Sequence, residues 1–242
     1  MYGMPRFIEP VLLLAALAIP LPAASQVACH DDPLRINEQR EIDEAQIAAM
    51  LSAPPQVSVP AHIRSMLDDL VRVSPRLHGA PPVQLVAIHD RELNAFAADH
   101  GVIILTTALW DPRHGLSDDE LAAVLAHELA HVEARDGLAE ACDMQLRVGD
   151  ASTGIAQVRA RLATLNPASA LGRNAVELLH EQELLADARG ITLLKLAGRN
   201  PQAMPSVLAK LHAPGPPGAS VMTAPTHPEL GERLARAEAL AH

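Results

Sequence analysis

Aromatic side chains are scarce in this sequence, at 2% of its 242 residues, although 49% of the residues are hydrophobic. The core must therefore be aliphatic, and Leu and Ala favour helices, whereas sheet sandwiches rely more on β-branched and aromatic residues. We expect a mainly helical α+β fold. This length supports one well-packed core and is too short for two large ones, so a single domain is predicted.

The sequence also lacks any run of basic residues, and its formal net charge is −10. Proteins that bind nucleic acids release counterions from phosphates through clustered Lys and Arg, so we expect no nucleic-acid partner. The apolar run from Val11 to Leu21 is far shorter than the roughly 20 residues that a spanning helix needs, and no later run is better. A soluble mature chain is predicted, with at most peripheral membrane association.

That apolar run belongs to an N-terminal segment typical of a secretory signal peptide. Arg6 precedes it, and small residues at 23–25 follow it, in a position suited to cleavage. We interpret residues 1–25 as a signal peptide and 26–242 as a single exported domain, either periplasmic or secreted. The alternative is an uncleaved N-terminal anchor.

Cysteine is nearly absent, and the two that occur are Cys29 and Cys142. Such a pair is compatible with a disulfide in an oxidising compartment, in agreement with export. Cys29 could alternatively accept a lipid. However, Gln26 stands three residues before it, where a lipoprotein signal carries Leu or another small apolar residue, so lipid anchoring is less favoured.

The first half of the chain changes from a helical to a strand-like pattern. Apolar residues recur at helical spacing within 37–75, which predicts two leading helices. Residues 83–108 contain β-branched and alternating apolar stretches, with Asp99, His100 and Gly101 as turn residues between two of them. These stretches predict a small antiparallel sheet.

Residues 117–242 are predicted to form the helical, catalytic part of the chain. Ser117 and Glu120 make a capping box that starts one long helix. A second long helix is expected over residues 175–198. The intervening residues 136–175 are more polar and are interrupted by Gly and Pro, so they predict a surface excursion with at most one helix, around Ile155 to Leu165.

The first long helix contains LAAVLAHELAHVEARD, which is apolar on all sides of a helical wheel except for three residues. Glu128 falls within the leucine stripe, and His127 and His131 lie at its margin. An unpaired carboxylate there would cost several kcal/mol, so it needs a partner. Histidines four residues apart can share a zinc ion, while the intervening glutamate faces the attacking water. The alternative is histidines that only satisfy hydrogen bonds in the core.

A catalytic zinc site needs a third protein ligand, and the second long helix offers acids in the stretch ELLAD. Glu183 and Asp187 are four residues apart within an apolar stripe. We assign Glu183 as the ligand and Asp187 as the acceptor of the free ring N–H of a ligating histidine. His180 lies toward the flank and Glu181 points away, so neither is preferred. Gly190, on the same face, would let another helix come close.

The stretches HELAH, ELLAD and THPELGER, in this order, resemble the HtpX-like gluzincin metallopeptidases, a family that also contains CAAX prenyl proteases and periplasmic quality-control proteases. The resemblance covers roughly residues 86–240. It implies a zincin-like fold and again assigns Glu183 and Asp187. It also implies that His227 steadies the developing oxyanion. Arg233 would pair with an acid near the site, the alternative being a solvated surface arginine.

The same resemblance implies an endopeptidase reaction, with one zinc ion per chain and with Glu128 as the base that takes a proton from water. The stretch ELNAFAADHGVIILTTAL is similar to the family's strand pair, although the usual Pro-Gly-Gly turn is replaced here. An extended substrate would add as an antiparallel strand to the edge formed by residues 94–97 or to its hairpin partner, with little sequence demand. The implied substrates are misfolded or unfolded exported polypeptides, and the implied substrate-binding residues are Asn94, Ala95, Phe96 and Ala97.

Two other functions are considered. A chaperone-like protein could retain the zinc for stability without hydrolysis, but such a site would not need Glu128. A membrane-tethered protease would need a spanning segment, and none is predicted.

Overall fold

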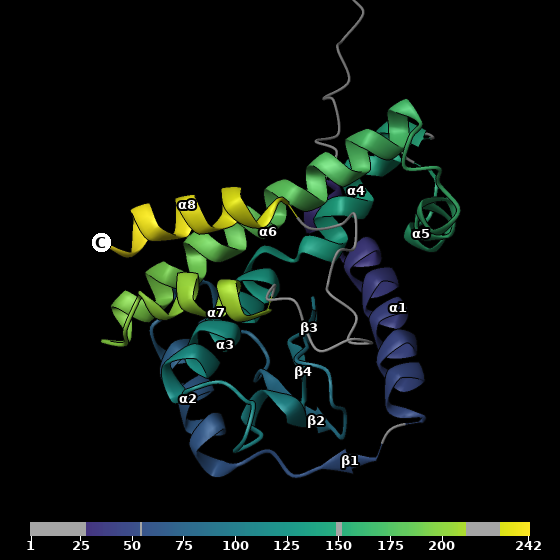
Figure 1. Ribbon diagram of the computed structural model, residues 1–242. Helices are drawn as coiled ribbons and strands as arrows, with labels where there is room; N and C mark the ends of the chain where they lie inside the picture. The colour runs from purple at the N-terminus through teal and green to yellow at the C-terminus, as the bar shows by residue number, and fades with distance from the viewer. Residues whose placement is uncertain (1–27, 54, 149–151, 212–227) are drawn as a thin grey trace, which may run out of the picture.

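A small sheet stands between helices in the computed structural model of the protein (Figure 1). Helix α1 covers one face of the sheet, α2 and α3 cover the other, and α6, α7 and α8 lie beyond α3. The predicted signal peptide, residues 1–25, lies outside the described residues, which are 28–53, 55–148, 152–211 and 228–242. The α-helices are α1 (Pro33–Leu51), α2 (Ala61–Arg72), α3 (Asp118–Ala134), α4 (Asp136–Val148), α5 (Ile155–Ala163), α6 (Ala170–Leu196), α7 (Ala203–Leu211) and α8 (Leu230–Ala241).

The sheet has four strands in the order β1-β2-β4-β3, namely β1 (Gln56–Val57), β2 (Gln84–Ile88), β3 (Ala95–Ala98) and β4 (Val102–Thr106). The last two form an antiparallel hairpin, with Ala95 opposite Leu105 and Ala98 opposite Val102. Gly101 closes the turn with φ +89°, a conformation that glycine adopts without strain. The predicted hairpin and its turn residues are therefore present.

The expectation of a wholly antiparallel sheet is wrong for its central pair. Strands β2 and β4 run parallel, with Gln84 opposite Val102 and Ile88 opposite Thr106. Between them the chain first forms β3, so that β4 returns to the position beside β2 and leaves β3 at the edge. A central strand is buried on both faces and reads as a continuous apolar run, as VIIL in β4 does. The sheet is mixed.

Alternate residues of the sheet face two different clusters, as the period of a strand requires. Ile103 and Leu105 are fully buried in the main core with residues of α2 and α3. Val102 and Ile104 instead belong to a smaller cluster, against which Ile47 of α1 packs. The first helix therefore has a small apolar contact with the sheet, whereas α3 lies within the main core.

The prediction of a surface excursion over residues 136–175 is wrong. Helix α5 is the one helix that was expected there, but α4 occupies the first part of the segment, and α6 begins at Ala170, earlier than predicted. Leu138 and Met144 of α4 are buried against Ile155 and Val158 of α5 in a cluster of their own. Although this region is polar, its short helices form a core together, and the polar residues Glu140 and Gln145 of α4 are themselves buried.

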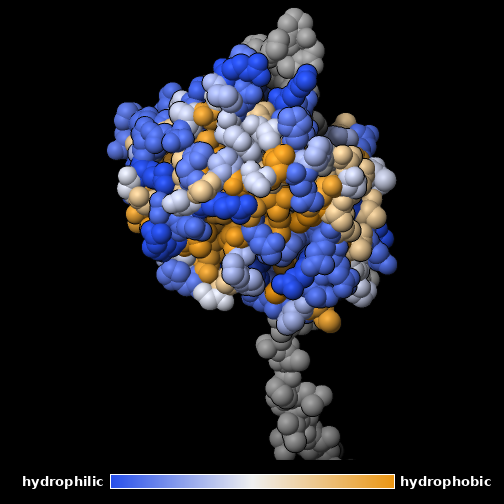
Figure 2. Space-filling view, turned by 90° about the horizontal axis from the view of Figure 1, so that it is seen from below, coloured by the Kyte–Doolittle hydropathy of each residue, from blue (hydrophilic) through white to orange (hydrophobic). Residues whose placement is uncertain are grey.

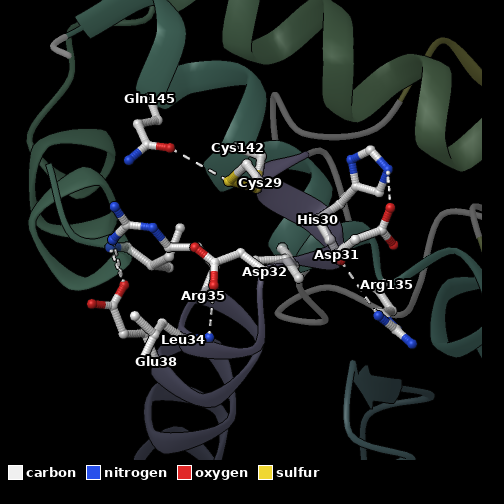
Figure 3. Close-up of a disulfide and its surroundings, with 12 residues drawn as sticks. Cys29, His30, Asp31, Asp32, Leu34, Arg35, Glu38, Arg135, Cys142 and Gln145 are labelled. Carbon is white, nitrogen blue, oxygen red and sulfur yellow. Dashed lines mark hydrogen bonds and ion pairs between the residues drawn. A yellow bond between two sulfur atoms is a disulfide. The ribbon is translucent and has the colours of Figure 1, made fainter. Parts of the chain in front are cut away.

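A disulfide joins Cys29, in a short 3-10 helix (Cys29–Asp31), to Cys142 in α4 (Figure 3). It connects positions 113 residues apart and fastens the start of α1 to the helix that follows α3. Because both sulfur atoms are used, Cys29 has no free thiol for lipid attachment in this state.

Among the described residues, no helix combines the length and apolar character needed to cross a membrane. Apolar side chains nevertheless gather in a central band on the face shown in Figure 2, bordered by polar ones.

Candidate metal centre

The polar residues of the motif on helix α3 are largely buried. It begins at the predicted capping box, in which Ser117 Oγ accepts the Glu120 N–H at 3.3 Å and Glu120 Oε2 accepts the Ser117 N–H at 2.9 Å. Glu128 is 9% exposed among fully buried leucines. His127 and His131 are also largely buried, with side chains 13% and 18% exposed.

Helix α6 packs directly against α3 and supplies the third donor. At their closest point, a Cβ on Gly190 would lie 3.2 Å from the His127 backbone nitrogen and 3.3 Å from the Ala126 carbonyl carbon. A Cβ at these separations would be closely crowded, so the glycine favours this approach. Two turns earlier in α6, Glu183 lies over the two histidines with its side chain 14% exposed.

Three side-chain donors meet between the two helices. His127 Nε2 and His131 Nε2 are 3.0 Å apart. Each lies 3.6 Å from an oxygen of Glu183. All three donor atoms lie within 4.8 Å of one another.

This trio fits a zinc ion by its chemistry and its spacing. Two imidazole nitrogens and a carboxylate oxygen are a donor set that zinc accepts in catalytic sites. Donors about 2.1 Å from a tetrahedral ion are about 3.4 Å from one another, which the observed separations bracket. Within the part of the chain that the structure describes, no other trio of His, Cys, Asp or Glu donors is as close.

Asp187 lies against the ring of His127, the pair of residues that the sequence analysis brought together. Its Oδ1 lies 3.0 Å from His127 Nδ1, so a proton on Nδ1 leaves Nε2 free toward the cluster. Burial alone would raise the pKa of Asp187. The hydrogen bonds from Arg233 and His127 outweigh burial and lower that pKa below its usual range.

Arg233 is a buried member of this network and not a solvated surface arginine. It is 4% exposed and donates from Nε and Nη2 to the two oxygens of Asp187, each at 2.8 Å. Its Nη1 also lies 3.0 Å from Glu183 Oε2. Helix α8 thus supplies the cation that balances Glu183 and Asp187, the two acids of α6 at the site.

Asp136 was not expected at the site. It is the first residue of α4, and its Oδ2 lies 2.6 Å from His131 Nδ1. Burial lowers the pKa of His131, but the hydrogen bond with Asp136 and the charges of Glu128 and Glu183 raise it to about 9. The sequence carried one weak signal for this contact, an acid at the last position of the stretch LAAVLAHELAHVEARD.

Glu128 lies deep in the same site. Its burial raises the pKa of the carboxyl group, against the opposing charges of His127 and His131. A raised pKa suits a group that must take up a proton and release it again near neutral pH.

A cavity of about 550 Å³ opens beside the cluster. The edge strand β3 forms one wall, so the predicted substrate-binding residues Asn94, Ala95, Phe96 and Ala97 all line it. Helix α1 contributes to the wall with Gln39, Asp43, Gln46 and Met50.

Two other candidates do not join the cluster, and the structure does not describe a third. His180 is half-buried, Glu181 is exposed, and neither belongs to the trio of donors. His227 lies outside the described residues.

A comparison with protein families matches residues 59–241 to the model for "Peptidase family M48". Among curated proteins, the chain is 33% identical over 171 residues to the "Beta-barrel assembly-enhancing protease" of Escherichia coli (strain K12), which covers 64% of this chain and 34% of that protein. The "Protease HtpX homolog" of Ralstonia pickettii (strain 12J) is 30% identical over 207 residues, or 65% of this chain and 68% of that protein.

Among solved structures, the crystal structure of S. mikatae Ste24p matches with a TM-score of 0.52 over 83% of this chain and 55% of that one. At 16% identity this similarity concerns the fold, and it confirms the mainly helical, zincin-like architecture. The chain spans about a third of the length of the Escherichia coli relative.

Proposed function

The chain belongs to Peptidase family M48, and on that premise we propose that it is a zinc-dependent endopeptidase of exported, misfolded or unfolded polypeptides. The observation that carries the proposal is the convergence of His127, His131 and Glu183 around one point, with the buried carboxyl group of Glu128 beside them. Peptidases act on polypeptides, and the cavity along β3 offers space for one.

His127, His131 and Glu183 would hold the zinc ion. When bound, zinc supplies a Lewis acid that polarises the scissile carbonyl and lowers the pKa of the attacking water. Glu128 takes the proton of that water and transfers it to the leaving amine. Its buried position keeps the carboxylate from being fully solvated, which strengthens it as a base.

Two further residues would assist. Asp187 holds His127 in the tautomer that leaves Nε2 free, and Arg233 stabilises Asp187 and Glu183 as anions. We assign His227 to the oxyanion on the family resemblance alone, because it lies outside the described residues.

The edge of β3 is suited to an extended substrate. Thr106 donates its backbone N–H to Asn94 O, so by the alternation of an antiparallel ladder the backbone groups of Ala95 and Ala97 point away from β4. They are available to a substrate strand, which would be recognised mainly through its backbone.

Export and a role in protein quality control belong to the same proposal. The disulfide between Cys29 and Cys142 supports an oxidising compartment. A relative whose name refers to assembly of beta-barrels supports substrates among exported proteins. Expression of the whole chain with mass spectrometry of its N-terminus tests export, and removal of residues 1–25 is expected.

The decisive variant is Glu128→Gln, measured for zinc content and for digestion of casein. It should retain zinc, because the ligands are intact, and lose cleavage by at least about 100-fold, because the base is gone. Glu181→Gln is the matched control, since this exposed glutamate precedes the ligand Glu183 by two positions. A chelator should abolish wild-type digestion, and zinc should restore it.

Undiminished cleavage by Glu128→Gln would refute the proposal. Wild-type protein that binds zinc, never cleaves and suppresses aggregation would instead establish the chaperone-like function. Fractionation of cells that express the chain, with signal cleavage blocked or intact, separates an exported protease from a membrane-tethered one.

A further inference from the structure

We propose that Asp136 is a positioning residue for the metal centre, which holds His131 and ties together the two helices that carry the donors. The inference rests on the proposed zinc site. It starts from the 2.6 Å contact between Asp136 Oδ2 and His131 Nδ1, in which each side chain is only 18% exposed.

The contact determines which nitrogen of His131 faces the metal. A proton on Nδ1, donated to Asp136, leaves the lone pair on Nε2, the atom that lies 3.6 Å from Glu183 Oε1. His127 uses the same arrangement with Asp187 on its own Nδ1. Each histidine of the centre therefore has its own carboxylate, and the two carboxylates come from different helices.

An interruption of the helix between α3 and α4 makes this contact possible. In a continuous helix, residues five apart are separated by about 140° around the axis, so Asp136 would face away from His131. Arg135 instead has φ 52° and ψ 54°, the left-handed conformation, between the end of α3 and the start of α4. This residue ends α3 and turns the chain, so that the first side chain of α4 lies back over the last ligand.

Asp136 is itself held by two other elements. Its backbone carbonyl accepts a hydrogen bond at 2.9 Å from Nε2 of the buried Gln182, which precedes the ligand Glu183 in α6. The next two backbone N–H groups, of Gly137 and Leu138, donate hydrogen bonds to the carboxylate of Asp99 in the β3–β4 turn, at 3.0 and 2.6 Å. The start of α4 thus connects α3, α6 and the hairpin beside the proposed substrate strand.

The test compares the zinc affinity of full-length variants by competition with a chelating indicator. Asp136→Ala should weaken zinc binding about 10- to 100-fold, the usual loss when the partner of a ligating histidine is removed. Asp136→Asn keeps a neutral acceptor and should recover part of that loss. The matched control is Asp143→Ala, which changes a half-buried aspartate in the same helix that pairs with Arg147.

A purely structural role for Asp136 predicts a different result. The midpoint temperature of thermal unfolding would fall in the variants whose metal has been removed by a chelator. Their zinc affinity and the absorption spectrum of the cobalt-substituted site would match wild type. Zinc affinity within twofold of wild type in Asp136→Ala overturns the inference. If that variant does not fold, Asp136→Asn decides: weaker zinc binding with a changed cobalt spectrum supports positioning, and wild-type values for both overturn it. If the wild-type protein binds no zinc, the proposed function itself is contradicted. This outcome is distinguishable from failure of the inference, which is seen only when the variants are compared with a wild type that binds zinc.

Discussion

Arg233 and Asp187 form a two-point contact in the interior, from Nε to Oδ2 and from Nη2 to Oδ1, each at 2.8 Å. They lie 46 positions apart in sequence, on α8 and α6. Asp187 in turn contacts His127, so α8 reaches the metal centre through one carboxylate.

Removal of the Arg233 side chain should therefore destabilise the folded protein strongly. Arg233→Ala leaves the buried Asp187 without its main cationic partner, and we expect the free energy of unfolding to fall by about 3–5 kcal/mol in urea titrations of the chelated protein. Arg236→Ala is the control: it breaks an exposed pair with Glu232 and should cost no more than about 1 kcal/mol. Equal losses in the two variants would contradict a structural role for the buried pair.

The contact of α6 with α3 depends on Gly190. A Cβ there would meet Met204 Cε at 2.7 Å and the His127 backbone nitrogen at 3.2 Å, so Gly190→Ala should separate the helices and cost about 1–3 kcal/mol. Weaker zinc binding should accompany this loss, because the donors come from both helices. Gly231→Ala, where a Cβ would meet nothing within 4 Å, should be neutral or slightly stabilising. A fully stable Gly190→Ala would show that the helices can repack.

Asp99 should make stability depend on pH. Burial, together with the nearby charge of Asp43, raises the pKa of Asp99 to about 6, although the Leu138 and Gly137 N–H groups oppose the shift. The unfolded value is about 3.9, so the folded state binds the proton more tightly. The contribution is fully present below about pH 4 and is lost as pH rises through about 6.

Unfolding titrations from pH 4 to pH 7 test this sign. Asp99→Asn has no proton to bind at this position, so only wild type should lose this contribution as pH rises. The unfolding free energy of wild type minus that of the variant should therefore decrease across that interval by up to about 3 kcal/mol. A difference that stays constant with pH, or grows, would show that the carboxylate is not protonated in the folded protein near pH 6.

The disulfide should stabilise the attachment of α1. Replacement of both Cys29 and Cys142 by Ser should lower the free energy of unfolding by about 2–4 kcal/mol, since the bond restrains a long stretch of unfolded chain. A reductant should reproduce this loss in wild type. It should leave the double variant unchanged, and a further loss there would mean that the reductant acts elsewhere, for example on a bound metal.

Helical periodicity and the cost of burying charge are sufficient to locate the candidate donors in the sequence. A 3.6-residue repeat is a local property, so it places His127 and His131 side by side on α3. A carboxylate in an apolar stripe requires a partner, which singles out Glu128 and Glu183. The structure brings these four side chains together, with Asp187 on the ring of His127 as predicted.

The order of the strands and the packing of the polar region, residues 136–175, could not be predicted in this way. Strands β2, β3 and β4 are recognisable from their own residues, whereas the two-residue β1 was not predicted. The parallel pairing of β2 with β4 depends on where the chain returns after β3. Helix α4 buries Leu138 and Met144 because α5 and other distant segments pack against them. Both are relations between segments, about which a local pattern carries no information.

The sequence by itself determined the two long helices, the spacing of the donors and the chemistry that they can support. The tertiary structure decided which distant side chains complete the centre. Arg233 is a buried partner because α8 packs on α6, and Asp136 reaches His131 because the left-handed Arg135 interrupts the helix between them. Side chains on one helix keep positions fixed by the helical repeat, whereas contacts across a break or between helices follow from packing.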